Sequence, residues 1–190
     1  MNLVIFGPPG AGKGTQSNFI VKKYSLFQLS TGEVLRNEIK NKTELGKKIS
    51  SIINSGSLVS DDIVKKLVEV FISDKKYKNR LIFDGYPRNL NQANTLKELL
   101  SKYGQKIDLV LKLSVSLETI TKRIVERRTL EKRADDSEEI AIKRYNTYEK
   151  STEPMIEYYK KLNLLKVVNG ESSISEINGE ISGLIEGIEG

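Results

Sequence analysis

The sequence predicts a three-layer α/β fold, with a five-stranded parallel sheet between two layers of helices. Short apolar runs rich in β-branched residues alternate with helical stretches, and that alternation is typical of parallel sheets. Most of the runs are continuously apolar, as expected for strands that are covered on both faces. The predicted strands are residues 3–6, 26–29, 81–83, 109–113 and 164–168.

Between the second and third predicted strands, the chain holds more helix than a simple crossover requires. Helical patterns cover residues 31–40, 43–54 and 61–71. This excess predicts a small helical insertion.

Two helix starts have the capping-box pattern, in which a hydroxyl and a carboxylate three residues later satisfy free backbone amides. They are Ser30 with Glu33 and Ser173 with Glu176. The last predicted helix also repeats glycine at every fourth position, at 179, 183 and 187. Acidic residues interrupt this face, so we interpret it as a surface for close helix packing rather than for dimerisation in a membrane.

Length and composition favour one domain over residues 1–190. Of the 190 residues, 38% are hydrophobic and 29% charged, which is typical of globular proteins that fold in water. The chain has no cysteine and no histidine. We therefore expect no zinc site, no disulfide and no histidine-dependent triad, and a cytoplasmic location fits the lack of cysteine.

The apolar N-terminus, residues 1–6, has no basic region before it and leads at once into glycines. It resembles a buried strand rather than a signal peptide. No apolar run approaches the roughly 18 residues that a spanning helix needs, so we expect no membrane partner.

The net charge of +6 allows nucleic acid, an anionic membrane or a polyanionic small ligand as a partner. Most lysines fall on the polar faces of predicted helices, which favours solvated faces. The arginines instead fall within the motifs described below. We expect small-molecule substrates and no nucleic-acid partner.

Directly after the first predicted strand, residues 7–15 read Gly-Pro-Pro-Gly-Ala-Gly-Lys-Gly-Thr. This matches the G-x-x-x-x-G-K part of a phosphate-binding loop, in the strand–loop–helix context that the motif requires. Inward-pointing amides, a helix starting near Gly14 and the Lys13 ammonium suit a triphosphate, so the sequence predicts a P-loop NTPase fold. The predicted ATP contacts in this loop are Gly10, Ala11, Gly12, Lys13, Gly14 and Thr15.

If this loop holds the phosphate donor of a kinase, a separate acceptor pocket is also needed, and two motifs are candidates for it. Residues 30–36 place Arg36 after a helix start, where its forked guanidinium can bind a monophosphate, although Arg36 alone fits a surface position equally well. Residues 83–88 place Asp84 at the end of a buried strand, where ligands bind in open sheets. We expect Asp84 to hold Mg²⁺ through water and Arg88 to reach the acceptor phosphate, whereas an ordinary tight turn would need neither residue.

The loop, Ser-Thr-Gly-Glu at 30–33, Gly-Ser-Leu-Val-Ser-Asp at 56–61, and Asp-Gly-Tyr-Pro-Arg at 84–88 followed by Gln92 together resemble the adenylate kinase family. The match is ordered and runs from Leu3 to the C-terminus. The resemblance implies reversible phosphoryl transfer from ATP to AMP, giving two ADP, with Mg²⁺ as cofactor and an AMP-binding segment over residues 30–59. It implies AMP contacts from Thr31, Arg36, Ser57, Leu58, Val59, Gly85, Tyr86, Pro87, Arg88 and Gln92, the last on the adenine edge.

Kinases for UMP and CMP share the loop and the Asp-Gly-(aromatic)-Pro-Arg turn, so they are the nearest alternative. Those relatives typically carry other residues at the equivalents of Thr31 and Gln92, which favours AMP here. One departure from the family is Glu33, where an aspartate is usual.

Further along, Arg123 and Arg127 lie one helical turn apart, and Arg133 and Arg144 follow. Taken alone, they fit a basic helix face, because acidic residues are interleaved. The resemblance implies that Arg123 and Arg127 contact ATP and that Arg133 and Arg144 bridge to the AMP phosphate. It also implies a short lid over residues 126–136, in a segment of roughly a dozen residues between two helices, and a donor base held near Ser172.

Together, Lys13, Arg88, Arg123, Arg133, Arg144 and Mg²⁺ would supply the positive charge for transfer. A P-loop ATPase or nucleotide switch is a further alternative, and the acceptor motifs speak against it. An inactive AMP sensor is disfavoured by Lys13 and the arginines of the lid. Two mobile segments suit a monomer.

Overall fold

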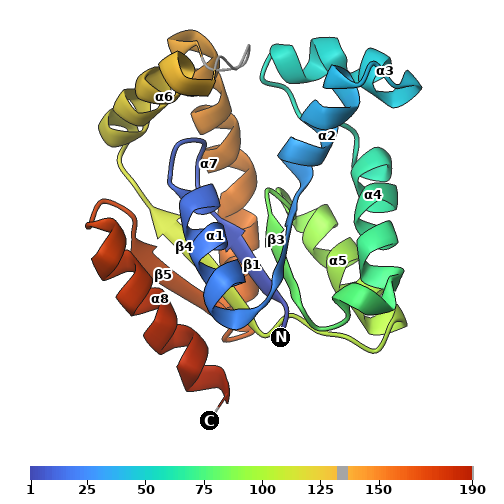
Figure 1. Ribbon diagram of the computed structural model, residues 1–190, viewed down its shortest axis with the longest axis vertical. Coiled ribbons are helices and arrows are strands. Elements are labelled where there is room, and N and C mark those ends of the chain that lie inside the picture. The colour runs from blue at the N-terminus through green and yellow to red at the C-terminus, as the bar shows by residue number, and fades with distance from the viewer. Residues whose placement is uncertain (132–136, 190) are drawn as a thin grey trace.

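The computed structural model describes residues 1–131 and 137–189, with side chains described for 1–127 and 137–188. Within these residues the sheet has five strands, all paired in parallel, in the order β2-β3-β1-β4-β5 (Figure 1). The strands are β1 (Leu3–Phe6), β2 (Phe27–Ser30), β3 (Leu81–Asp84), β4 (Leu109–Ser114) and β5 (Leu165–Asn169). Each predicted strand is confirmed to within one residue at either end.

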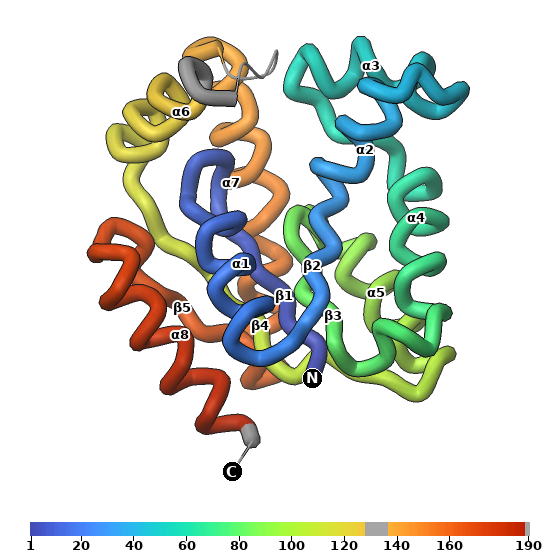
Figure 2. The backbone as a smooth tube through the Cα atoms, viewed as in Figure 1, coloured from blue at the N-terminus to red at the C-terminus, as the bar shows by residue number. Residues whose placement is uncertain are grey.

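Helices cover both faces of the sheet, which explains why the strands are apolar at successive positions. Alternate residues of β1 point to opposite faces: Leu3 and Ile5 pack in one core, and Val4 and Phe6 in the other. The first core includes residues of α1 (Lys13–Tyr24) and α8 (Ile174–Glu189), which lie side by side in Figure 2. The second includes residues of α4 (Asp61–Ser73), α5 (Leu90–Lys102) and α7 (Glu138–Lys161).

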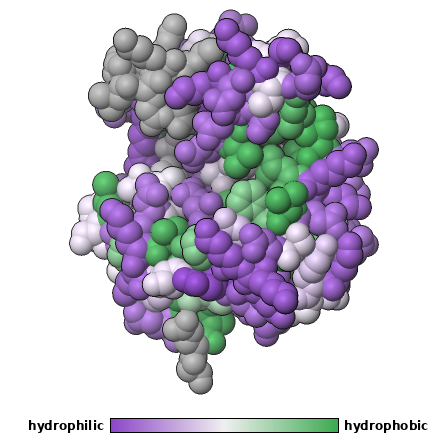
Figure 3. All heavy atoms as spheres, turned by 45° about the vertical axis from the view of Figure 1, so that its right-hand side comes forward, coloured by the Kyte–Doolittle hydropathy of each residue, from purple (hydrophilic) through white to green (hydrophobic). Residues whose placement is uncertain are grey.

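The predicted helical insertion is present between β2 and β3. It consists of α2 (Thr31–Lys40), α3 (Glu44–Asn54) and α4, followed by a 3-10 turn, η1 (Lys75–Tyr77). The α2–α3 pair extends above the carboxyl end of the sheet and faces α6 (Leu117–Glu131) and α7 (Figure 1). On the face in Figure 3, apolar side chains gather below this pair, and polar side chains cover most of the remaining surface.

One of the two predicted capping boxes is confirmed. The Glu176 carboxylate accepts a hydrogen bond from the Ser173 amide at 2.9 Å, and the Ser173 hydroxyl accepts one from the Glu176 amide at 3.3 Å. The prediction for Ser30 is wrong, because its side chain makes no cap hydrogen bond. Ser30 is still paired with Asp84 in the sheet, so the strand sets its backbone.

The prediction of close packing along the glycines of α8 is also wrong. A Cβ added at Gly179, Gly183 or Gly187 would meet nothing within 4 Å. The helix packs instead through Ile177, Ile181 and Ile185, each at most 5% exposed.

We therefore expect Gly183→Ala to raise the free energy of unfolding by about 0.5–1 kcal/mol, because alanine restricts the unfolded chain and meets no obstacle in the helix. Gly46→Ala is the matched control in α3, where a Cβ would lie 2.1 Å from the Glu38 carbonyl oxygen. That variant should lose about 1–3 kcal/mol. Urea denaturation of both variants checks this pair, and equal effects would contradict it.

Helix α6 continues to Glu131, so the segment between the two helices is shorter than the dozen residues predicted from position 126 onward. The rest of the predicted lid, residues 132–136, lies outside the described residues. Among the described helices, none is long and apolar enough to cross a bilayer.

Candidate active site

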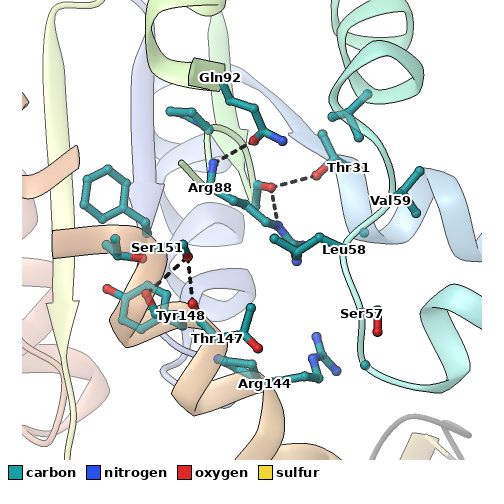
Figure 4. A pocket seen from close by; sticks show the side chains of 18 of the residues that line it. Thr31, Ser57, Leu58, Val59, Arg88, Gln92, Arg144, Thr147, Tyr148 and Ser151 are labelled. Carbon is teal, nitrogen blue, oxygen red and sulfur yellow. Dashed lines mark hydrogen bonds between the residues drawn. The ribbon is translucent and has the colours of Figure 1, made fainter. Parts of the chain in front are cut away.

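A single pocket brings together most of the residues predicted to bind the acceptor. It lies between the phosphate loop, the inserted helices, the turn after β3 and α7 (Figure 4). The predicted residues that line it are Lys13, Thr31, Arg36, Ser57, Leu58, Val59, Gly85, Pro87, Arg88, Gln92 and Arg144. They come from segments far apart in the sequence, as expected of a site built at the carboxyl ends of parallel strands.

The phosphate loop has the backbone that its glycines permit. Gly10 and Gly12 have φ of 83° and 92°, a region that other residues rarely adopt. A Cβ at Gly10 would also lie 3.1 Å from the Ile124 side chain and 3.2 Å from the Ile120 carbonyl oxygen. Gly12 is the N-cap of α1, so the loop leads directly into the N-terminus of this helix, which favours anions.

The ammonium of Lys13 lies within the loop, where it donates hydrogen bonds to the carbonyl oxygens of Gly7 at 2.8 Å and Pro8 at 3.0 Å. Burial is the main cause that lowers its pKa from 10.5 to about 8. The positive charges of Arg88, Arg144 and Arg127 lower it further, while the Asp84 carboxylate opposes them. Lys13 therefore lies close to several other cations. An anionic ligand bound between them would reduce their mutual repulsion.

This depressed pKa predicts proton uptake when a polyphosphate binds. At pH 8 about half of the free protein has a neutral Lys13, and a bound triphosphate would favour the charged form. Because tripolyphosphate itself exchanges protons in this pH range, we expect the native protein to take up about half a proton more per site than Lys13→Met at pH 8, with the difference falling towards zero at pH 6.5. Calorimetry in buffers of different ionisation enthalpy measures this difference, and equal uptake by the two proteins would contradict the assignment.

Asp84 ends β3 and is only 7% exposed. Its Oδ2 accepts a hydrogen bond from the Gln28 amide nitrogen of β2 at 2.9 Å, a partner that the sequence analysis did not identify. The carboxylate is close enough to raise the pKa of Lys13, so it lies beside the phosphate loop. Among the described residues no group of three or more carboxylates or other metal ligands occurs. Asp84 nevertheless fits Mg²⁺, which is usually bound by one or two carboxylates together with water and substrate phosphates.

The carbonyl oxygen of Gly85 holds two of the predicted AMP-binding residues. It accepts hydrogen bonds from the Thr31 hydroxyl at 3.0 Å and from Arg88 Nε at 2.7 Å. Gly85 has φ of 77°, and a Cβ there would lie 3.1 Å from Arg88 Nη2 and 3.2 Å from the Thr31 hydroxyl oxygen. A larger residue at position 85 would displace the Thr31 or Arg88 side chain, so this position favours glycine.

Gln92 is 3% exposed and is held at both ends of its amide. Its Oε1 accepts from the Arg88 backbone amide at 2.7 Å, and its Nε2 donates to Asp61 Oδ1 at 2.7 Å. Figure 4 shows Gln92 on the α5 side of the pocket, across from the helix that carries Arg144.

Helix α7 contacts the inserted segment directly. The Lys143 ammonium donates to the Ser55 carbonyl oxygen at 2.7 Å. A Cβ at Gly56 would lie 2.9 Å from the Ile140 side chain and 3.1 Å from Arg144 Cγ, so this turn packs closely on the helix. Arg144 projects from α7 towards the loop of Ser57 and Leu58 (Figure 4).

The residues predicted for the donor lie on the other side of the phosphate loop. Arg123 Nη2 donates to the Gly170 carbonyl oxygen at 3.0 Å, and a Cβ at Gly12 would be 4.0 Å from Arg123 Nη1. The turn that carries Ser172 thus begins beside Arg123. Arg127 is close enough for its charge to lower the pKa of Lys13. Arg133 lies outside the described residues.

The structure does not bring Tyr86 to the pocket, and its ring is part of the core, 1% exposed. The sequence analysis, in turn, missed one whole wall of the pocket. This wall comprises Thr147, Tyr148, Ser151, Thr152 and Met155 of α7. Their spacing of three and four from Arg144 is the signal that could have identified them, since such positions share a helix face.

Comparison with known proteins adds a second line of evidence. Residues 5–164 match the sequence profile of the family described as adenylate kinase. A curated adenylate kinase of Pelagibacter ubique is 42% identical and covers 98% of this chain and 100% of its own length. Adenylate kinases of Fusobacterium nucleatum, 40% identical, and Prochlorococcus marinus, 43% identical, each cover 95% of this chain and 96% of their own.

Proposed function

Because this chain belongs to the adenylate kinase family and is a phosphotransferase that converts ATP and AMP into two ADP, we propose how its two sites divide the substrates. The phosphate loop, with Gly10 to Thr15, binds the ATP triphosphate. The pocket between the inserted helices and α7 binds AMP. The observation that supports this division most is that the positive charges of Arg88, Arg127 and Arg144 all lower the pKa of the buried Lys13 ammonium. We propose that the two sites meet at this ammonium.

Phosphoryl transfer requires little covalent chemistry from the protein, because most of the rate acceleration comes from positioning the substrates and neutralising their charge. The AMP phosphate is itself an anionic nucleophile, so no general base is needed. We propose that Lys13 binds the ATP phosphates, that Arg88 and Arg144 hold the AMP phosphate, and that Arg123 and Arg127 contact ATP. Arg133 is proposed to act with them, on the family resemblance alone.

Mg²⁺ would neutralise phosphate charge during transfer. We propose that Asp84 holds it through bound water, while Gln28 fixes the orientation of the carboxylate through its hydrogen bond to Oδ2.

The remaining assignments concern AMP. We propose that Thr31, Arg36, Gly85, Pro87, Gln92 and the segment of Ser57 to Val59 contact it, because all of them line the pocket. Residues 30–59 would then act as the AMP-binding segment and residues 126–136 as a short lid. Ser172 and its turn would lie against the donor base.

We also propose that the protein acts as a monomer in the cytoplasm, with nucleotides rather than nucleic acids or membranes as its partners. The placement of Arg36, Arg88 and Arg144 supports small anionic partners, since all three line the pocket.

The test of the proposed function is the dependence on both nucleotides. With Mg²⁺, we expect ADP to form only when ATP and AMP are both supplied, at two ADP for each ATP consumed. Release of inorganic phosphate from ATP alone at a comparable rate would instead indicate an ATPase or switch.

A further inference from the structure

Asp61, the first residue of α4, contacts the side chain that we propose reads the adenine base. Its Oδ1 accepts from Gln92 Nε2 at 2.7 Å, and its Oδ2 accepts from Asn91 Nδ2 at 2.8 Å. The Asn89 amide nitrogen also lies 3.4 Å from Oδ1. Asp61 does not line the pocket, so any effect on AMP must act through Gln92.

The hydrogen bonds fix which way the Gln92 amide faces. The backbone amide of Arg88 can only donate, so the Gln92 oxygen must face it. An ionised carboxylate can only accept, so the Gln92 nitrogen must face Asp61. Burial alone would raise the pKa of Asp61, but hydrogen bonds from Asn91, Gln92 and Asn89 outweigh it and hold the pKa below its usual value. Asp61 is therefore ionised at neutral pH.

One donor and one acceptor of Gln92 remain for a ligand. The amide nitrogen has a second N–H and the oxygen has a second lone pair. Adenine offers an amino group beside a ring nitrogen that accepts, which matches this pair. A 6-oxopurine reverses the pattern, with an oxygen beside an N–H, and it would match the amide only if the amide turned over.

We propose that Asp61 is a positioning residue that makes the acceptor site selective for a 6-aminopurine over a 6-oxopurine monophosphate, by preventing the Gln92 amide from turning over. Turning it over in the native protein would place an oxygen against a carboxylate and an N–H against the Arg88 amide. Without the carboxylate only the contact with Arg88 opposes the turn. This inference rests on the proposed function, since it takes AMP as the ligand of this pocket.

The experiment compares kcat/KM for AMP and for IMP, with ATP as donor, in the native protein and in Asp61→Ala. A hydrogen bond to a charged group corresponds to roughly a ten- to hundredfold factor, so we expect the AMP to IMP ratio to fall by about that much. The KM for ATP should be unchanged, because Asp61 does not contact the phosphate loop.

Two further variants separate positioning from a structural role. Asp61→Asn keeps the size of the side chain, but its amide can donate as well as accept, so the Gln92 amide could turn over beside it and the selectivity should fall as in Asp61→Ala. Asn91→Ala removes a contact of Asp61 on the side away from Gln92 and should leave the ratio unchanged. A folded Asp61→Ala whose ratio stays within twofold of the native value overturns the inference, as does an equal loss in all three variants.

Failure of this inference can be distinguished from failure of the proposed function. If the native protein makes no ADP from ATP and AMP, the proposed function fails. If it does so and Asp61→Ala selects AMP equally well, only the role of Asp61 is contradicted.

Discussion

Arg88→Ala should lower kcat for ADP formation by at least two orders of magnitude, because it removes a cation that stabilises the negative charge developing on the transferred group. The guanidinium lines the acceptor pocket, and its charge lowers the pKa of Lys13 in the phosphate loop, so it lies near both proposed phosphate sites. The loss corresponds to about 3 kcal/mol or more of transition-state stabilisation. Steady-state kinetics with saturating ATP and AMP measure it.

The fold should tolerate this change. Arg88 Nε donates to the Gly85 carbonyl oxygen, and Thr31 remains as a second donor to that oxygen. We expect a loss of no more than about 1 kcal/mol in the free energy of unfolding. Arg88→Lys keeps the charge but not the fork, and it should recover only part of the rate. A large loss of stability in Arg88→Ala would indicate a structural arginine.

Lys13→Met should also lower kcat by roughly two to three orders of magnitude, because the ammonium is proposed to bind the phosphates in the transition state. Methionine has a similar length and no charge. Kinetics with varied ATP should therefore show the loss mainly in kcat and kcat/KM.

Stability should change little in Lys13→Met, for two opposing reasons. Removing an ammonium whose pKa is lowered mainly by burial relieves a desolvation cost. The change also leaves the Gly7 and Pro8 carbonyl oxygens without this donor. Thermal unfolding alongside the kinetics checks the balance, and a variant that keeps kcat within tenfold of the native value would contradict the role of Lys13.

Much of the fold could be predicted because strands and helices have distinct apolar periods. The five strands were placed to within a residue since each is a short apolar run. The central strands β1 and β3 are buried along their whole length, whereas β5 at the edge of the sheet is mostly exposed. Two of the errors, at Ser30 and along the α8 glycines, share a cause. A local pattern shows that a contact is possible, but tertiary structure decides whether the partner is present.

The site could be predicted in part for a similar reason. Lys13, Asp84 and Arg88 belong to contiguous motifs at the ends of strands, where a parallel sheet must gather them. Gln28 and the α7 wall lie outside the sequence motifs, and Asp61 ends the 56–61 motif without a role that the sequence predicts. Their roles depend on which atoms the fold brings within hydrogen-bonding distance, such as Gln28 Nε2 at 2.9 Å from Asp84.

The most direct test of the central claim is the choice of acceptor. A coupled assay with ATP and Mg²⁺ should be run against AMP, CMP, UMP and GMP in turn, with kcat/KM determined for each. The family predicts a clear preference for AMP, and the Gln92 amide, in the proposed contact with the base, would match adenine but not the oxygen and N–H of guanine or uracil. A preference for UMP or CMP would contradict the account.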